Sequence, residues 1–206
     1  MSELLEPLLK LLSENSRYPK YQHERRIDLF LNFYLSSILA KYFNVRVDTI
    51  IPEFPLKKES SQASTNVDFL AYSDASKIVF FVEIKTDDSS FKESQLDCYC
   101  RATEQSWRKL VEDIVKIRKA TAARHRKKYD YLLSKLQSMA PEVMRIVYIG
   151  PECVRKKVVE RSEKIMFISL ESLRDRIDMS DNESHNAAWN VIRQYVLKPQ
   201  IKELSL

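Results

Sequence analysis

Three ionisable side chains stand out in residues 66–87, because they interrupt stretches that are otherwise largely apolar. Asp68 lies in the first stretch, and Glu83 and Lys85 end the second, after a gap of 14 residues. A charged group beside an apolar core is costly unless it is paired or binds a ligand. Two neighbouring carboxylates can bind one hard cation through their oxygens. These residues therefore indicate either a metal-dependent chemistry or a structural ion-pair cluster.

Two predicted strands position these side chains. Residues 67–72 and 77–86 have the composition of strands, and the turn-like residues 73–76 between them predict an antiparallel hairpin. Side chains alternate between the faces of a strand, so Glu83 and Lys85 should share one face. Both faces of the second strand begin with apolar residues, which predicts a central strand that is covered on both sides.

The expected turn also sets the register of this hairpin. A short turn centred on Asp74 and Ala75 would pair Tyr72 with Lys77. Asp68 would then lie one diagonal step from Glu83, on the same face, with β-carbons somewhat under ~7–8 Å apart. The ammonium group of Lys85 should lie beside the two carboxylates.

The arrangement resembles a known nuclease motif. Asp68 followed by Glu83-Ile84-Lys85 resembles the core motif of the PD-(D/E)xK nuclease superfamily, in which a strand, a turn and a second strand end in E-x-K. Val67 stands where the name of the motif has proline. The resemblance covers about residues 20–100 and implies an α/β, restriction-endonuclease-like fold, with a mixed β-sheet core flanked by helices.

Two further matches lie on helices. Gln95 and Tyr99 match the Q-x-x-x-Y pattern of the RecB-like branch, on the helix after the E-x-K strand. Glu24 lies on the first long helix, where many members have a glutamate near the site. Side chains four residues apart on a helix share a face, and the resemblance implies that this face of Gln95 and Tyr99 points towards the site. Glu53, on the first expected strand, is a weaker candidate of the same kind as Glu24.

The resemblance implies a role for each of these residues. Asp68, Glu83 and the backbone carbonyl of Ile84 would hold Mg²⁺, with Mn²⁺ as a second option. Lys85 would orient the attacking water and offset the charge that builds up on the phosphate. Gln95, Tyr99 and Glu24 would support the site. The implied reaction is hydrolysis of phosphodiester bonds, with DNA as the expected substrate.

The other elements complete a mixed α/β pattern in one domain of residues 1–206. Residues 45–56 should be an extended segment whose prolines, Pro52 and Pro55, suit an edge strand. Helices are expected over residues 2–14, 19–43, 171–177 and 184–197, and over 90–139 in two or three pieces; further strands are expected over 145–149 and 164–170.

Composition excludes several classes of protein. The chain of 206 residues has a single glycine, Gly150, so the glycine-rich phosphate loops and the G-x-S-x-G elbow are excluded. Three cysteines without paired spacing predict buried or half-buried free thiols in a reducing compartment. We find no run of apolar residues long enough to cross a membrane, and the expected location is the cytoplasm.

Positive charge is concentrated in residues 108–128. The net charge of the chain is +5, yet this segment has nine basic residues against Glu112 and Asp113. The segment is either a solvated helix face or a surface that contacts nucleic-acid phosphates. The candidate contact residues are Arg108, Lys109, Lys116, Arg118, Lys119, Arg124, Arg126, Lys127 and Lys128.

Two other functions remain open alongside a nuclease. The chain could be a non-catalytic nucleic-acid-binding module that uses residues 108–128, or a protein-interaction domain in which the charged cluster is structural. Cleavage of both strands of a duplex would need two sites, which a homodimer would supply.

Overall fold

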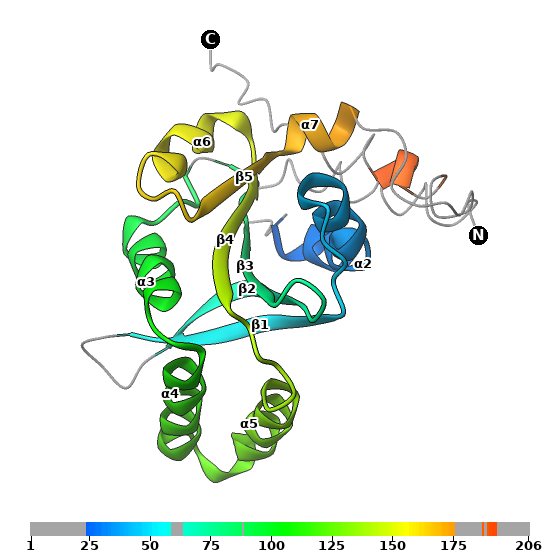
Figure 1. Cartoon of the computed structure of the whole chain (residues 1–206). Helices are drawn as coiled ribbons and strands as arrows, with labels where there is room; N and C mark the ends of the chain where they lie inside the picture. The colour runs from blue at the N-terminus through cyan, green and yellow to red at the C-terminus, as the bar shows by residue number, and fades with distance from the viewer. Residues whose placement is uncertain (1–23, 59–63, 88, 176–186, 188, 193–206) are drawn as a thin grey trace.

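The computed structural model describes residues 24–58, 64–87, 89–175, 187 and 189–192, and Figure 1 shows their arrangement. In chain order the elements are α2 (Glu24–Phe43), β1 (Thr49–Lys57), β2 (Ser64–Ser73), β3 (Ile78–Ile84), α3 (Glu93–Glu104), α4 (Trp107–Ala120), α5 (Ala123–Leu136), β4 (Val143–Gly150), α6 (Glu152–Val159), β5 (Ile165–Ser169) and α7 (Leu170–Asp175). The predicted helix 2–14, the start of the predicted helix 19–43 and most of the predicted helix 184–197 lie outside the described residues.

The strands form one mixed sheet of five strands in the order β1-β2-β3-β4-β5. β1, β2 and β3 are antiparallel neighbours, whereas β4 and β5 run parallel to β3. Parallel neighbours need long connections, which α3, α4 and α5 supply before β4 and α6 supplies before β5. The fold is therefore α/β, as predicted. β1 lies at an edge of the sheet, which agrees with its prolines Pro52 and Pro55.

Helices cover both faces of this sheet (Figure 1). On one face, α2, α7 and residues 189–192 pack on the strands, and Leu35 of α2 and Phe80 of β3 belong to the same buried cluster. On the other face, α3, α4, α5 and α6 contribute to a second cluster, which contains Tyr99 of α3 and Phe81 of β3. The sheet is thus the middle layer of three.

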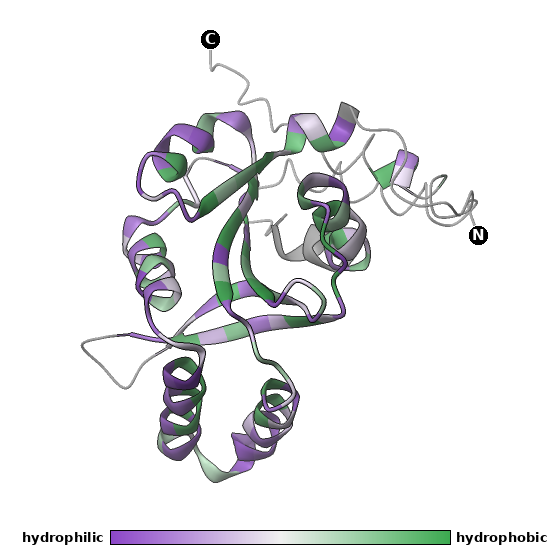
Figure 2. Ribbon diagram, in the orientation of Figure 1, coloured by the Kyte–Doolittle hydropathy of each residue, from purple (hydrophilic) through white to green (hydrophobic). Residues whose placement is uncertain are grey.

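The central strand β3 separates the two clusters. Its residues from Val79 to Ile84 are all buried, because alternate side chains enter opposite clusters, as the sequence predicted. Figure 2 shows this as hydrophobic colour along the strands, whereas α4 and α5 have many hydrophilic residues on their outer surfaces. Glu83, near the end of β3, is therefore a buried charged residue beside an apolar interior.

The turn between β2 and β3 differs from the expected one. Ser73 pairs with Ile78, so the loop consists of residues 74–77 and lies one residue further along the chain than the predicted loop of residues 73–76. The carboxylate of Asp74 accepts hydrogen bonds from the hydroxyl of Tyr72 at 2.9 Å and from Nζ of Lys77 at 2.7 Å. These bonds hold the loop closed.

Displacement of the loop by one residue along the chain shifts the register by two residues. Tyr72 pairs with Val79 rather than with Lys77, so the predicted register was wrong. Because the shift is an even number of residues, no side chain changes face. The predicted common face of Asp68 and Glu83 is therefore unaffected.

The long helical stretch after β3 consists of three helices, α3, α4 and α5, within the predicted two or three. Ser106 caps α4 by accepting a hydrogen bond from the backbone N–H of Lys109 at 3.2 Å. Thr121 is extended and separates α4 from α5. The helix α6 was not predicted; it has eight residues and buries Val154 and Val158. Pro151 at its start is a residue typical of helix beginnings and could have indicated it.

All three cysteines are free thiols. Cys98 is buried and Cys100 is half-buried, as predicted, whereas Cys153 is exposed on α6 and contradicts the prediction. None of the helices in the described ranges is long and apolar enough to cross a bilayer.

Candidate active site

Asp68, Glu83 and Lys85 come together where β2 and β3 separate. The register of these strands, carried one pair beyond its last partners, places Asp68 opposite Glu83. Lys85 follows β3 directly, and its backbone N–H donates to the carbonyl of Ile149 in β4 at 2.8 Å. The residue after the strand is thus still held by the sheet, so its side chain keeps the face of Glu83.

Glu83 and Lys85 form a buried ion pair. Nζ of Lys85 lies 2.6 Å from Oε1 of Glu83. Glu83 is 1% exposed and Lys85 is 4% exposed. Burial of two charges is favourable only when geometry and hydrogen bonds compensate for the lost hydration. Burial raises the pKa of Glu83, while the charge of Lys85 and hydrogen bonds from Lys85 and Tyr99 oppose that rise.

Asp68 reaches the same cluster from the neighbouring strand. Its Oδ2 accepts a hydrogen bond from the backbone N–H of Ile84 at 2.6 Å, which ties β2 to the last residue of β3. Asp68 is half-buried, whereas Glu83 is buried, so Asp68 is the more accessible of the two carboxylates. Solvent or a ligand would approach the cluster from the side of Asp68.

The helix α3 contributes Gln95 and Tyr99, as the Q-x-x-x-Y match predicted for their common face. The hydroxyl of Tyr99 lies 2.7 Å from Oε2 of Glu83 and 2.9 Å from the backbone carbonyl of Asn66. Nε2 of Gln95 donates to the same carbonyl at 3.4 Å. Both side chains therefore connect α3 to the strand that contains Asp68.

The hydroxyl of Tyr99 has one hydrogen and two neighbouring acceptors. If Glu83 is protonated, it can donate to Tyr99, and Tyr99 can donate to Asn66, so each oxygen has a partner. If Glu83 is ionised, Tyr99 must leave one acceptor without its hydrogen. Burial, followed by the charge of Glu83, raises the pKa of Tyr99, so the phenol stays neutral.

The donor set is compatible with a hard cation. Asp68 and Glu83 offer carboxylate oxygens at one end of the sheet, which is the chemistry that Mg²⁺ prefers. In the described part of the chain, no group of three or more His, Cys, Asp or Glu side chains could hold a metal ion. A Mg²⁺ ion here would thus complete its shell with main-chain and water oxygens, as it commonly does.

The two remaining predicted site residues are Glu24 and Glu53, and the described side chains show neither in contact with the cluster. Glu24 is the first residue of α2, and its side chain is not among those that the structure describes. Glu53 is exposed on β1 and accepts a hydrogen bond from Nδ2 of Asn66 at 3.1 Å. Glu53 is therefore linked to the cluster only through Asn66.

The basic segment 108–128 forms α4, the start of α5 and the link between them, beside the β1 edge of the sheet (Figure 1). Several of its cations have acidic partners nearby: Arg108 pairs with Glu112, Lys109 and Lys116 pair with Asp113, and Arg118 pairs with Asp130. Much of the charge on α4 is thus compensated within the helical pair.

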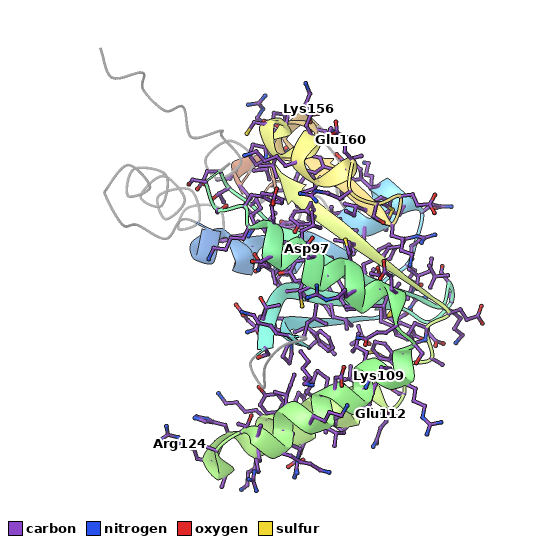
Figure 3. The ribbon with its side chains drawn as sticks, turned by 90° about the vertical axis from the view of Figure 1, so that its left-hand side faces the viewer. Asp97, Lys109, Glu112, Arg124, Lys156 and Glu160 are labelled. Carbon is purple, nitrogen blue, oxygen red and sulfur yellow. The ribbon has the colours of Figure 1, made fainter. Side chains whose placement is uncertain are left out.

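The remaining basic residues of this segment are exposed: Lys119, Arg124, Arg126, Lys127 and Lys128. Figure 3 shows Arg124 at the end of the α4–α5 pair that is remote from Lys109. Lys128 lines a groove of about 700 Å³ between β1 and α5, together with Tyr131, which is 67% exposed. The structure therefore spreads the predicted contact residues over several surfaces.

Sequence reasoning missed two members of the site. Asn66 serves through its backbone carbonyl, which no side-chain pattern can reveal. Tyr148 of β4 pairs with Glu83 in the sheet, and its ring centroid lies 6.5 Å from that of Tyr99. Burial, followed by the charge of Glu83, raises the pKa of Tyr148 as well. The apolar strand composition around Tyr148 was its only signal.

A scan against protein-family models, a search of curated proteins and a search of solved structures each found no match to this chain.

Proposed function

We propose that this protein is a metal-dependent nuclease that hydrolyses phosphodiester bonds in DNA, on a restriction-endonuclease-like core. The observation that supports it best is the cluster of Asp68, Glu83 and Lys85, which the middle of β2 and the end of β3 bring to one face together with Tyr99. The fold is consistent with it too, since the resemblance implied a mixed sheet flanked by helices and the described residues form such a sheet.

The residues of the chain divide the work as follows. Asp68 and Glu83 would hold Mg²⁺, with the carbonyl of Ile84 as a further oxygen ligand. Lys85 would release Glu83 towards the metal and direct its ammonium group to the phosphate, where it offsets developing negative charge. Gln95 and Tyr99 would hold α3 against β2 through their hydrogen bonds to the carbonyl of Asn66.

The bound ion would supply Lewis-acid chemistry, polarising the phosphate and making a neighbouring water more acidic. Holding such an ion requires Glu83 to be ionised, although burial raises its pKa. The cation itself would favour the ionised form, because an opposite charge nearby stabilises a carboxylate. Without the cation, Lys85 stabilises the ionised form of Glu83 through the 2.6 Å contact of Nζ with Oε1 of Glu83.

A second candidate is a non-catalytic nucleic-acid-binding or protein-interaction module, in which the cluster is structural. The observation that favours it is the nearly complete burial of Glu83 and Lys85, whose charges satisfy each other in the interior. In that case, the pair would hold the end of β3 in place and would never meet a substrate.

Nuclease assays with matched variants separate the two candidates. Purified protein is incubated with linear, circular and single-stranded DNA in the presence of Mg²⁺ or Mn²⁺, with EDTA as the control. Cleavage should require the divalent ion and should be lost in Asp68→Asn and Lys85→Ala. The matched controls are Asp97→Asn and Lys156→Ala, exposed residues on α3 and α6 that Figure 3 labels. Circular dichroism verifies that each variant folds.

Two results would contradict the proposal. Cleavage that persists in Asp68→Asn and Lys85→Ala would place the chemistry elsewhere or in a contaminant. A folded protein that shows no cleavage with either ion on any substrate would favour the structural reading. If duplex DNA is cut on both strands, sedimentation analysis would then show whether a homodimer supplies the two sites.

A further inference from the structure

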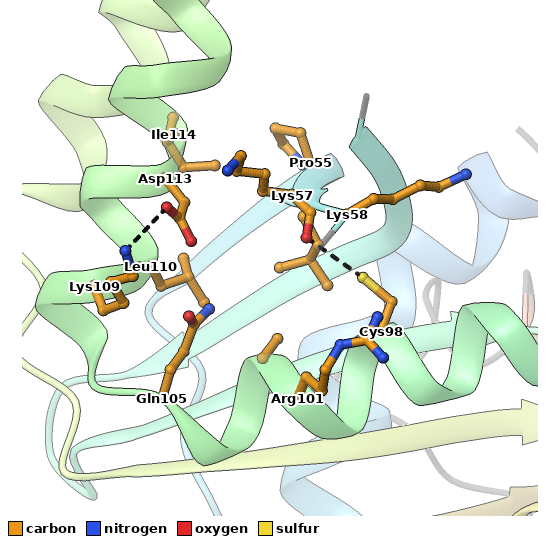
Figure 4. Close-up of a pocket in the computed structure, with 12 residues that line it drawn as sticks. Pro55, Lys57, Lys58, Cys98, Arg101, Gln105, Lys109, Leu110, Asp113 and Ile114 are labelled. Atoms are coloured by element: carbon orange, nitrogen blue, oxygen red, sulfur yellow. Dashed lines mark hydrogen bonds and ion pairs between the residues drawn. The ribbon is translucent and has the colours of Figure 1, made fainter. Parts of the chain in front are cut away.

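A basic channel lies along α3, next to the candidate active site. Two cavities share the residues Lys58, Cys98 and Arg101 in their walls. The first, of about 280 Å³, lies between α3, α4 and the end of β1, as Figure 4 shows. The second, of about 420 Å³, continues along α3 to Gln95. Together they form one channel, called the α3 channel below.

One face of α3 forms the side of this channel. Its residues Ser94, Cys98 and Arg101 follow one another at steps of four and three, so they lie along one stripe of the helix, and Gln105 follows directly after the end of α3. The thiol of Cys98 contacts the carbonyl oxygen of Lys57 at 3.8 Å, which fastens the end of β1 to the helix. The channel is thus bounded by two elements that are held together.

The walls of the α3 channel are strongly basic. Among the described residues that line it, one is acidic, Asp113, and that carboxylate already lies 3.5 Å from Lys109 and 3.0 Å from Lys116. The basic residues in the walls are Lys57, Lys58, Lys92, Arg101 and Lys109. Such an excess of cations lowers the potential energy of a polyanion in the channel.

The lining also indicates which part of a nucleic acid would fit. No aromatic side chain is among the described residues of the two walls, so bases have no ring to stack on there. The polar residues Thr65, Ser94 and Gln105 can instead hydrogen-bond to phosphate oxygens. Contacts of this kind position a strand without reading its sequence.

The α3 channel ends near the candidate site, at Gln95. Gln95 lines its second cavity and also donates to the carbonyl of Asn66, to which Tyr99 is bonded. A strand with one phosphate at Asp68 could therefore continue along α3 towards α4. Of the nine predicted contact residues, Lys109 is the one that lines this path.

We propose that the α3 channel binds the phosphodiester backbone of a nucleic-acid strand that extends from the candidate active site, with Lys58 and Arg101 as the central contacts. The proposal rests on the proposed nuclease function for the direction of the strand. Both residues line both cavities and both are exposed, so their truncation to alanine should leave the fold intact.

The test measures binding without hydrolysis. Fluorescence anisotropy in EDTA compares the wild-type protein, the double variant Lys58→Ala/Arg101→Ala and the control Lys156→Ala/Lys157→Ala, which removes the same charge from exposed positions on α6. The probes are single-stranded DNA, duplex DNA and single-stranded RNA, with inorganic polyphosphate as competitor. The channel variant should bind more weakly to probes of any sequence, and its salt slope should fall by about 2. The control should change little.

Four outcomes would overturn this inference: wild-type affinity in the channel variant, an equal loss in the control, binding of polyphosphate but of no nucleic acid, or no binding of any probe. Failure of the nuclease proposal gives a different pattern. If the protein binds nucleic acid through the α3 channel but never cleaves it, the catalytic role of Asp68 and Lys85 is contradicted and the channel proposal is supported. If wild type and Lys58→Ala/Arg101→Ala cleave DNA equally well, the nuclease proposal is supported and the channel proposal is contradicted.

Discussion

Gly150, the single glycine of the chain, packs directly against Lys85. A β-carbon at position 150 would lie 3.2 Å from the carbonyl oxygen of Lys85 and 3.3 Å from its β-carbon. Gly150 ends β4, the strand that neighbours β3, and pairs with Ser169 of β5. The absence of a side chain at this one position lets the backbone after β3 lie close to β4.

Gly150→Ala should therefore disturb the candidate site. The added methyl group meets backbone as well as the first carbon of a side chain, and such overpacking typically costs about 1–3 kcal/mol. Chemical denaturation should show this loss, and cleavage should fall because Lys85 moves. Gly150→Val should be worse than Gly150→Ala. Wild-type stability and activity in Gly150→Ala would show that Lys85 can shift without consequence.

Removal of Lys85 should destabilise the protein in a pH-dependent manner. Lys85→Ala leaves Glu83 buried without its cation, a change that commonly costs about 3–5 kcal/mol. Burial already raises the pKa of Glu83 above its unfolded value, and the loss of Lys85 raises it further. A folded state with a raised carboxyl pKa binds its proton more tightly, so its stability falls as pH rises through that pKa.

The penalty of Lys85→Ala should thus be larger at about pH 8 than at about pH 5. Urea unfolding at both pH values, compared with wild type, measures the difference. In the double variant Glu83→Gln/Lys85→Ala, position 83 no longer titrates, so most of the pH dependence should vanish. A penalty that is the same at both pH values in Lys85→Ala would mean that Glu83 does not take up a proton in the folded state.

The hydroxyl of Tyr99 should contribute to stability as well as to the site. Tyr99→Phe removes the partner of Oε2 of Glu83, whereas the Asn66 carbonyl keeps Gln95 as a donor; leaving the buried carboxyl oxygen unpaired costs about 1–3 kcal/mol. Thermal unfolding should show a lower midpoint. The matched control Tyr131→Phe changes a tyrosine that is 67% exposed and should have little effect. Equal midpoints for Tyr99→Phe and wild type would remove Tyr99 from the network.

Asp74 should stabilise the hairpin that sets the register. Hydrogen bonds from Lys77 and Tyr72 lower the pKa of Asp74, so the ionised carboxylate favours the folded state. That contribution is complete above the unfolded pKa and is lost as pH falls through the lower, folded pKa. Asp74→Asn should lower the thermal midpoint slightly at neutral pH, and the difference should shrink in acid. The control is Asp97→Asn on α3; a drop of equal size there would indicate a general charge effect.

Local sequence patterns were sufficient to predict much of the core and of the cluster. Apolar residues on both faces at the start of Ile78–Ile84 predicted a central strand, and the alternation of side chains placed Glu83 and Lys85 on one face. The predicted common face of Asp68 and Glu83 was correct although the predicted register was wrong. The register error was two residues, and side chains alternate faces with a period of two. Helical spacing likewise placed Gln95 and Tyr99 on one face, since positions four apart are neighbours in any helix.

Other features of the site depended on contacts between distant segments, which local periodicity does not encode. The burial of the Glu83–Lys85 pair, the use of the Asn66 carbonyl and the close approach of Gly150 to Lys85 each require β2, β3, β4 and α3 to be packed together. The α3 channel combines the end of β1 with residues of α3 and α4. The sequence determined which side chains face the same way, and the tertiary structure decided which of them meet, because their distances depend on how the elements pack.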